Sequence, residues 1–170
     1  RNSVDIIAVQ ESKINTNSTF VTDNYYWFNS TGVQIDDYNK VQKLRAQNSK
    51  VPESLLRKTR EHHGVCIGVS KKIAGTLERV EAISGRILAA HFVGAQDVVV
   101  IVAYAPTSEY GESEKDSFYD DLEEVFRRHK PHMLRIVAGD FNAKIIFLDD
   151  RDIADNIGNH YLRADEDTRA

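Results

Sequence analysis

An aspartate and an asparagine stand two residues apart at the end of a short apolar run. Residues 134–138 are typical of a strand buried on both faces, and Gly139 ends this strand. If the backbone stays extended beyond Gly139, the side chains of Asp140 and Asn142 leave the same face of the chain. A carboxylate can orient or deprotonate a water while a neutral amide donates to a phosphate oxygen, so the pair suits phosphodiester chemistry. An Asx turn is an equally open interpretation, because both residue types form such turns readily.

Two other predicted strands end in polar side chains that could join this pair. Residues 4–9 are almost wholly apolar and are followed by Glu11. Residues 98–103 predict a central strand that stops at Tyr104, just before a proline. Polar groups that follow buried strands can meet on one rim of a sheet. Alone, Glu11 would be interpreted as a surface residue and Tyr104 as a packing residue with a satisfied hydroxyl.

The remaining apolar runs predict the sheets that carry these strand ends. Glycine-containing turns separate four successive strands, and their short connections favour antiparallel neighbours: residues 64–70, 76–84, 86–93 and 98–104. Alternating polarity marks residues 76–84 as a half-exposed strand, and residues 25–28 predict a further short strand.

Residues 112–129 predict a helix that packs on a sheet. Its apolar positions recur with helical spacing at Phe118, Leu122, Val125 and Phe126. Acidic residues come early and basic residues late, as the helix dipole favours. Because the helix leads directly into the strand at Leu134, we expect its role to be structural.

The composition predicts a single domain over residues 1–170, because 41% hydrophobic residues in a chain of this length are enough for one core. The net charge of -4 hides a segregation of charge. Residues 34–63 predict a basic insertion loop, in part helical, whose stretch 38–60 holds seven bases and one acid, a local charge of +6. Such a loop is either a solvated face or an electrostatic guide for a polyanion. Residues 149–170 form an acidic polar tail with seven acids and three bases, a charge of -4.

A single cysteine and the lack of long apolar runs limit where the protein works. Cys66 lies inside an apolar run and cannot form an internal disulfide, which predicts a buried thiol in a reducing, intracellular compartment. No apolar run approaches the roughly 20 residues of a membrane span, so no membrane partner is expected.

Three strand-end motifs, taken in order, resemble the endonuclease/exonuclease/phosphatase superfamily of metal-dependent phosphodiesterases. They are Gln10-Glu11-Ser12-Lys13, Tyr104-Ala105-Pro106 and Gly139-Asp140-Phe141-Asn142. Within that superfamily the chain is most similar to the endonuclease domains of RTE-type non-LTR retrotransposons and to craniofacial-development-protein-like genes derived from them. The stretches that carry this finer resemblance are residues 4–13, 104–108, 118–122, 139–144 and 157–160.

The resemblance implies an α/β fold, a four-layer α/β sandwich whose site lies at one rim. Glu11 matches the family's metal-binding glutamate, and Tyr104 matches its phosphate-contacting tyrosine. Asp140 matches the aspartate that positions the attacking water and contacts the metal, and Asn142 matches the amide that steadies the phosphate. The ion implied is Mg²⁺, with Mn²⁺ as an alternative, because a hard cation that keeps several waters suits few carboxylates.

The resemblance also implies DNA as the substrate. Gln10 and Lys13 fall where relatives contact the nucleic-acid backbone. We expect the domain to nick DNA for a reverse transcriptase in the same polypeptide, which would place it in the nucleus. A phosphatase acting on small phosphate esters and an inactive remnant that binds nucleic acid are the alternatives. The family's opening strand with an active-site asparagine and its terminal Ser-Asp-His motif have no counterpart here, so we expect an incomplete domain from a larger nuclease.

Overall fold

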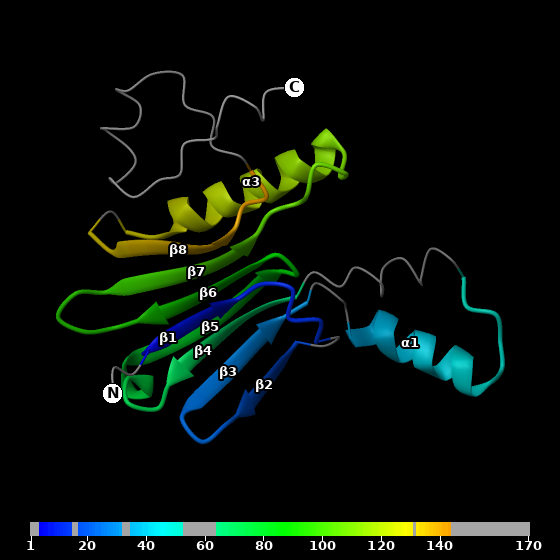
Figure 1. Cartoon of the computed structure of the whole chain (residues 1–170), viewed down its shortest axis with the longest axis horizontal. Helices are drawn as coiled ribbons and strands as arrows, with labels where there is room; N and C mark the ends of the chain where they lie inside the picture. The colour runs from blue at the N-terminus through cyan, green and yellow to red at the C-terminus, as the bar shows by residue number, and fades with distance from the viewer. Residues whose placement is uncertain (1–3, 15–16, 32–34, 53–63, 131, 144–170) are drawn as a thin grey trace, which may run out of the picture.

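The computed structural model describes residues 4–14, 17–31, 35–52, 64–130 and 132–143, which form two four-stranded sheets (Figure 1). The first sheet has the strand order β1-β4-β3-β2, and all its neighbours are antiparallel. Its strands are β1 (Ile6–Val9), β2 (Ser18–Val21), β3 (Tyr25–Ser30) and β4 (Val65–Ser70).

The second sheet has the order β5-β6-β7-β8. Its strands are β5 (Leu77–Ser84), β6 (Ile87–Phe92), β7 (Val98–Tyr104) and β8 (Leu134–Asp140). The expected antiparallel neighbours β5, β6 and β7 are confirmed, and β7 is the predicted central strand. The expectation that β4 pairs with β5 is wrong. Both edges of β4 are already bonded, to β1 and β3, so the chain crosses to the other sheet through a short 3-10 helix, η1 (Ala74–Thr76).

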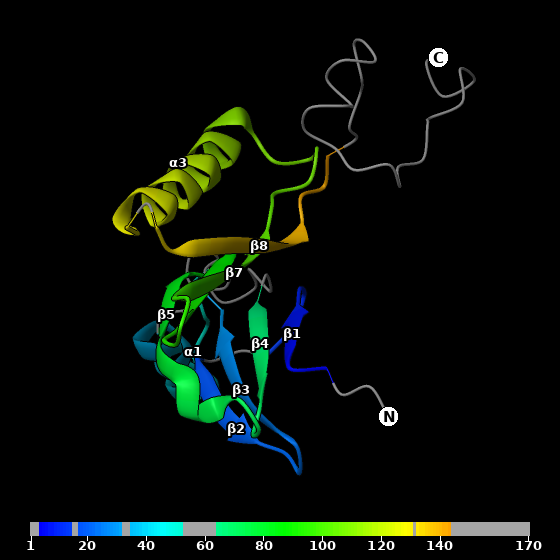
Figure 2. The ribbon, with the colours of Figure 1, turned by 90° about the vertical axis from the view of Figure 1, so that its left-hand side faces the viewer.

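The one parallel pair explains the position of the long helix. Parallel neighbours need a crossover connection, and α3 (Glu112–Arg128) supplies it between β7 and β8. The helix was predicted within one residue at its C-terminal end. Figure 2 shows α3 on the outer side of the second sheet, with the first sheet beyond it. The layers α3, second sheet and first sheet thus follow the order of the α/β sandwich implied by the family resemblance.

Alternation along the strands divides the core in two. Even-numbered positions of β6 and β7 face the first sheet, where Leu88, Val100 and Val102 pack with Ile67 and Val69. Odd-numbered positions face α3 and form the second cluster: Ile87, Ala89, Val99, Ile101, Ala103, Phe118 and Val125. A side chain on β7 therefore reaches either the space between the sheets or the helix according to whether its number is even or odd.

The outer strands are less buried than the sequence indicates. We expected residues 134–138 to be buried on both faces, but Leu134 is 49% exposed and Ile136 43% exposed. Within the part of the chain that the structure describes, β8 and β1 each pair with one strand only, so one flank of each stays open to solvent. For the same reason β1 is half-buried rather than fully buried.

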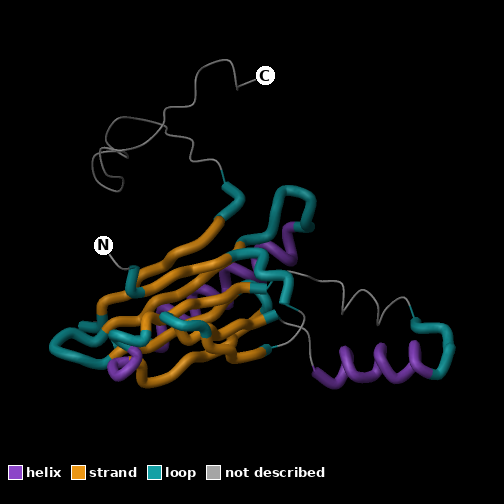
Figure 3. Tube along the Cα trace, turned by 60° about the horizontal axis from the view of Figure 1, so that its bottom comes forward, coloured by secondary structure: helices purple, strands orange, loops and turns teal. Residues whose placement is uncertain are grey.

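The basic insertion is helical in its first half. The helix α1 (Ile35–Ala46) confirms the expected partial helix, and Figure 3 shows it standing apart from both sheets. Residues 53–63 and the acidic tail 149–170 lie outside the described residues. Strand β2 was not predicted, because its four residues carry no clear alternation.

Two smaller observations concern Cys66 and the described helices. Cys66 is 3% exposed, and its burial raises the pKa of the thiol to about 11, which confirms the predicted buried thiol. Among the described helices, none has the length and apolar character that crossing a membrane requires.

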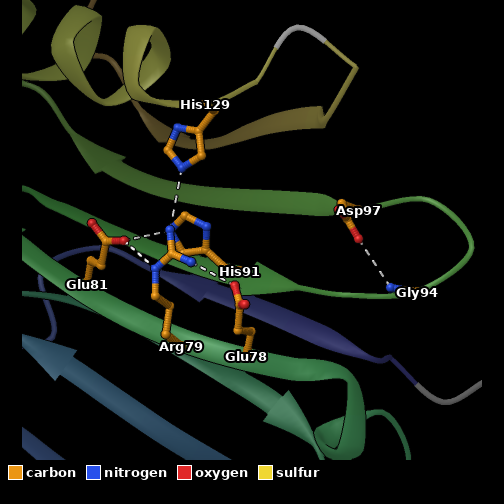
Figure 4. Close-up of polar contacts among 7 residues, drawn as sticks. All are labelled: Glu78, Arg79, Glu81, His91, Gly94, Asp97 and His129. Atoms are coloured by element: carbon orange, nitrogen blue, oxygen red, sulfur yellow. Dashed lines mark hydrogen bonds and ion pairs between the residues drawn. The ribbon is translucent and has the colours of Figure 1, made fainter.

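A partly buried polar cluster connects the C-terminal end of α3 to the second sheet (Figure 4). We call Arg79, Glu81, His91 and His129 the histidine cluster. The ring of His91 is fully buried and stacks on His129 with 4.8 Å between centroids. Its Nε2 lies 3.1 Å from Glu81 Oε1 and 3.5 Å from His129 Nε2. Arg79 Nε donates to the same Glu81 oxygen at 2.7 Å, and His129 Nδ1 contacts the carbonyl oxygen of Val125.

Candidate active site

A tyrosine and a glutamate from opposite sheets meet at one rim of the sandwich. Tyr104 has an even number on β7, so its side chain enters the space between the sheets, where it is 8% exposed. Its hydroxyl donates to Glu11 Oε1 at 2.9 Å. Glu11 is the second residue after β1, and β1, β7 and β8 all end at the same end of the molecule (Figure 1). The structure thus joins two residues that are 93 positions apart in the sequence.

The parallel pairing of β7 with β8 adds Asp140 to this rim. Tyr104 and Asp140 are register partners, and paired residues of parallel strands project to the same face of the sheet. The charge of Asp140 contributes to the raised pKa of Tyr104, which agrees with this placement. The partner of Gly139 is Ala103, and a Cβ at position 139 would lie 1.9 Å from the Ala103 carbonyl oxygen. A glycine here therefore lets the two strands lie close enough to bring Asp140 beside Tyr104.

Asn142 reaches the rim through a turn and not through an extended strand. The expectation of an extended backbone is wrong, because Asn142 has φ 46°. Its backbone N donates to Asp140 Oδ1 at 2.9 Å, which is the Asx turn held open as the alternative. The side-chain Nδ2 donates to the Ala105 carbonyl oxygen at 2.8 Å. The Asx turn therefore lies at the rim: the Asp140 side chain accepts its hydrogen bond, and the Asn142 side chain bonds to Ala105, the residue after Tyr104.

The backbone around Glu11 is held in an unusual conformation. Glu11 and the nearby Lys13 both have φ 52°, a left-handed region that side chains other than glycine rarely adopt. The intervening Ser12 is anchored on both sides: its N donates to the Gly64 carbonyl oxygen at 2.9 Å, and its Oγ donates to Asn29 Oδ1 at 2.6 Å. A Cβ at position 64 would lie 2.2 Å from Ser12 Oγ, so this close contact requires glycine. Strained backbone of this kind is characteristic of functional sites.

Gln10 and Lys13 flank Glu11 in the same loop. Gln10 is half-buried and Lys13 is exposed. Both lie within two residues of Glu11 in the sequence. Their contact with a nucleic-acid backbone stays a prediction.

The environment of Tyr104 keeps its hydroxyl protonated. Burial is the first cause of the raised pKa of Tyr104, and the hydrogen bond and charge of Glu11 add to it. The guanidinium of Arg86 acts in the opposite direction. At neutral pH Tyr104 is therefore a hydrogen-bond donor and not a base.

The oxygen donors at the rim fit a magnesium ion better than a softer metal. Glu11 and Asp140 are both exposed carboxylates, and each oxygen that accepts one hydrogen bond retains a further lone pair. Within the described ranges, no group of three or more His, Cys, Asp or Glu side chains could enclose a metal. One or two carboxylates with retained waters are the usual protein contribution to a Mg²⁺ site. The residues present therefore fit the implied ion.

One arginine at the rim was not among the expected site residues. Arg86 lies in the turn between β5 and β6, and its Nη1 donates to the Tyr104 carbonyl oxygen at 3.1 Å. Its guanidinium lies over two aromatic rings, 5.3 Å from the centroid of Tyr104 and 4.8 Å from that of Tyr110. The available signal in the sequence was a lone arginine after Gly85, immediately before a wholly buried strand.

Comparison with known proteins agrees with this geometry. The endonuclease/exonuclease/phosphatase family matches residues 1–168, almost the whole chain. No curated protein matched the chain. Members of the family act on phosphoester bonds and typically use divalent metal ions. The family match, the two facing sheets and the acid-tyrosine rim lead to one conclusion: the chain belongs to the endonuclease/exonuclease/phosphatase family.

Proposed function

We propose that the chain is a Mg²⁺-dependent DNA endonuclease domain of a retrotransposon-type protein. The observation that carries the proposal is the meeting of Tyr104, Glu11 and Asp140 at one rim, formed by strands of both sheets. A nick made in nuclear DNA would provide a primer for a reverse transcriptase carried in the same polypeptide. The motifs shared with RTE-type endonucleases support this finer assignment.

In the proposed reaction, Asp140 orients or deprotonates the attacking water. The carboxylate needs a fixed orientation for this role, and the hydrogen bond from the Asn142 backbone to Asp140 Oδ1 supplies it. Glu11 and Asp140 would hold the Mg²⁺, which when bound would neutralise charge on the phosphate. Mn²⁺ could replace it, because it also prefers oxygen ligands.

Tyr104 and Asn142 hold the phosphate in this proposal. The hydroxyl of Tyr104 stays protonated and can reorient between Glu11 and a phosphate oxygen. An amide nitrogen carries two hydrogens, and the bond from Asn142 Nδ2 to Ala105 uses one of them. The other can donate to a phosphate oxygen, and the fixed amide plane sets its direction.

Exposed bases on α1 favour a polymer over a small ester. Lys40, Lys43 and Arg45 are exposed, and two of them lie in the last turn of the helix. Such charges attract a polyanion and make its binding sensitive to salt, while a small phosphate ester gains little from them. This is the observation that favours DNA over the phosphatase alternative.

Parallel assays on two substrates test the proposal. Purified protein with Mg²⁺ should convert supercoiled plasmid to open circle and should leave para-nitrophenyl phosphate and bis-para-nitrophenyl phosphate largely intact. The double variant Lys43→Ala, Arg45→Ala should raise KM for DNA and flatten its dependence on salt. Lys115 and Arg127 of α3 form ion pairs with Glu112 and Glu123, so their double alanine variant is the matched control.

Each outcome of these assays has a definite meaning. Hydrolysis of the small esters alone would overturn the endonuclease assignment in favour of a phosphatase. DNA binding without cleavage of either substrate would favour the inactive remnant. Equal effects of the α1 and α3 variants would remove the role of the basic helix.

A further inference from the structure

Arg86 contacts Tyr104 through its side chain as well as through the backbone hydrogen bond of the sheet. Its side-chain Nη1 donates to the Tyr104 carbonyl oxygen, and its own carbonyl oxygen accepts from Tyr104 N at 2.8 Å. Its guanidinium also lies 5.3 Å from the centroid of the Tyr104 ring. One arginine thus contacts the donor, the acceptor and the ring of the same tyrosine.

These contacts limit the movements of the Tyr104 ring. The hydroxyl end is bonded to Glu11, and the guanidinium covers the ring. The guanidinium also lies 4.8 Å from the ring centroid of Tyr110, which belongs to the loop before α3. A planar guanidinium can stack on aromatic rings and donate hydrogen bonds at the same time, which an ammonium group cannot do. The side chain of Arg86 therefore connects the β5–β6 turn, the end of β7 and the loop before α3.

The charge of Arg86 also matters at this rim. Glu11 and Asp140 bring two carboxylates beside Tyr104, and both raise the pKa of its hydroxyl. Arg86 acts against them through its positive charge. The arginine thus offsets part of the negative field that a phosphate would meet as it approaches the tyrosine.

We propose that Arg86 is a positioning residue for phosphodiester hydrolysis, which holds the Tyr104 hydroxyl in place through its contacts with the rings of both Tyr104 and Tyr110. The inference rests on the proposed function, because it assumes that Tyr104 contacts the phosphate. Arg86 acts through Tyr104, so its removal lowers kcat more than it raises KM. The competing interpretation is that Arg86 only stabilises the fold.

The chain offers a matched control in Arg135. This residue makes the same kinds of contact on β8: its guanidinium lies 5.6 Å from the Phe126 ring centroid, and its Nη1 donates to the Phe126 carbonyl oxygen at 3.3 Å. Phe126 belongs to α3, on the other face of the sheet from Tyr104. The variants Arg86→Met and Arg135→Met therefore remove equivalent contacts, one at the rim and one away from it.

Steady-state nicking of a short duplex with saturating Mg²⁺ measures the effect. Arg86→Met should lower kcat by about 10–100-fold, because small displacements of positioning groups reduce rates strongly. KM should change less than about threefold, and Arg135→Met should leave kcat within about twofold of the parent. Arg86→Lys should behave like Arg86→Met, since it retains charge without the planar stack. Parent-like kcat in Arg86→Met, or an equal loss in Arg135→Met, would overturn the proposal.

A double-mutant cycle with Tyr104→Phe tests whether the effect passes through the tyrosine. Without the hydroxyl there is nothing for Arg86 to position, so adding Arg86→Met to Tyr104→Phe should lower kcat by less than about threefold further. Independent, multiplying losses would show that Arg86 does not act through Tyr104.

A readout without catalysis separates this inference from the proposed function. In protein labelled with ¹³C at tyrosine Cζ, the Tyr104 signal is assigned by its loss in Tyr104→Phe. Arg86→Met removes the guanidinium that lies over the Tyr104 ring, so at one fixed neutral pH the chemical shift of this signal should change, whereas Arg135→Met should leave it in place. A parent protein that cleaves no DNA would defeat the proposed function, while this comparison of chemical shifts would still decide whether Arg86 positions Tyr104. A chemical shift that is unchanged in Arg86→Met would overturn the positioning role.

Discussion

The second sheet carries two polar clusters, and they differ in how their charges are compensated. The histidine cluster lies between β5, β6 and the end of α3, and each of its charged groups has a partner inside the cluster (Figure 4). At the rim, the carboxylates of Glu11 and Asp140 are exposed and accept hydrogen bonds from neutral groups. In the part of the chain that the structure describes, the cluster thus pairs its charges internally, whereas the hydrogen bonds to the rim carboxylates come from uncharged groups.

Backbone strain distinguishes the two regions as well. Glu11 and Asn142 adopt left-handed backbone conformations at the rim. His91 lies in the middle of a regular strand, paired with Val99. A shifted pKa occurs in both places, since burial lowers that of His91 and raises that of Tyr104. The comparison teaches that a shifted pKa does not by itself distinguish the two regions, whereas exposed carboxylates on or beside left-handed backbone do.

Replacing Asp140 should give the largest effect, and it tests whether the rim is the active site. Asp140→Ala removes the proposed water-orienting carboxylate, so Mg²⁺-dependent nicking should fall by about 10²–10⁴-fold. The melting temperature should change little, because the side chain is exposed. Asp97→Ala is the matched control: Asp97 precedes the opposite end of β7, and its carboxylate accepts only a long 3.4 Å bond from Gly94 N (Figure 4). Unchanged nicking in Asp140→Ala would mean that the rim is not the active site.

Replacing Gly139 should combine loss of stability with loss of activity. In Gly139→Ala the new Cβ would lie 1.9 Å from the Ala103 carbonyl oxygen, so β8 must move away from β7. Overpacking of this kind destabilises by about 1–3 kcal/mol, and the shift carries Asp140 away from Tyr104. Urea unfolding and the nicking assay measure the two effects.

The control for this variant is Gly75→Ala, where a Cβ would meet no atom within 4 Å. It should retain both stability and activity. A fully stable and active Gly139→Ala would show that the close approach of the two strands is unnecessary, and the register argument for Asp140 would fail.

The sequence predicted the elements better than their pairing. The helix over residues 112–129 was visible because one amphipathic pattern determines it locally. The sequence did not show which sheet holds β4, because the short turn between β4 and β5 is also compatible with a hairpin. The burial of β8 was overestimated, since an apolar run does not reveal whether a strand has one neighbour or two.

The candidate site was predicted in its members but not in its geometry. Glu11, Tyr104 and Asp140 were identified because each follows an apolar strand, and the structure brings them together. Their contacts depend on register, which one sequence does not show. Arg86 was missed for the same reason: an arginine in a turn resembles any solvated residue until its stacking on Tyr104 is seen.

The pH dependence of stability should give the smallest effect, and it tests whether the histidine cluster has a structural role. The groups that face His91 are Glu78, Arg79 and Glu81 from β5 and His129 from the end of α3. Burial lowers the pKa of His91 in the folded protein, and the charge of Arg79 lowers it further. His91 Nδ1 is buried without a hydrogen-bond partner in the described structure, so protonation there would bury a donor with no acceptor.

Proton linkage determines whether this histidine makes stability rise or fall with pH. Below pH 6.5, the ordinary pKa of a histidine, the unfolded chain protonates this residue while the folded chain does not, so stability that is present above that pH falls as the solution is acidified. The slope contributed by one such group cannot exceed about 1.4 kcal/mol per pH unit. The melting temperature of the parent should therefore drop between about pH 7.5 and about pH 5.5.

In His91→Leu this drop should be smaller, whereas replacing the exposed His132 with Gln should leave it unchanged. Nicking by His91→Leu at neutral pH should stay close to the parent rate, because the histidine cluster lies on the face of the sheet opposite Tyr104. An identical acid response in all three proteins would show that the buried histidine does not control docking of α3, and the contrast between a closed cluster and an open rim would lose its energetic basis.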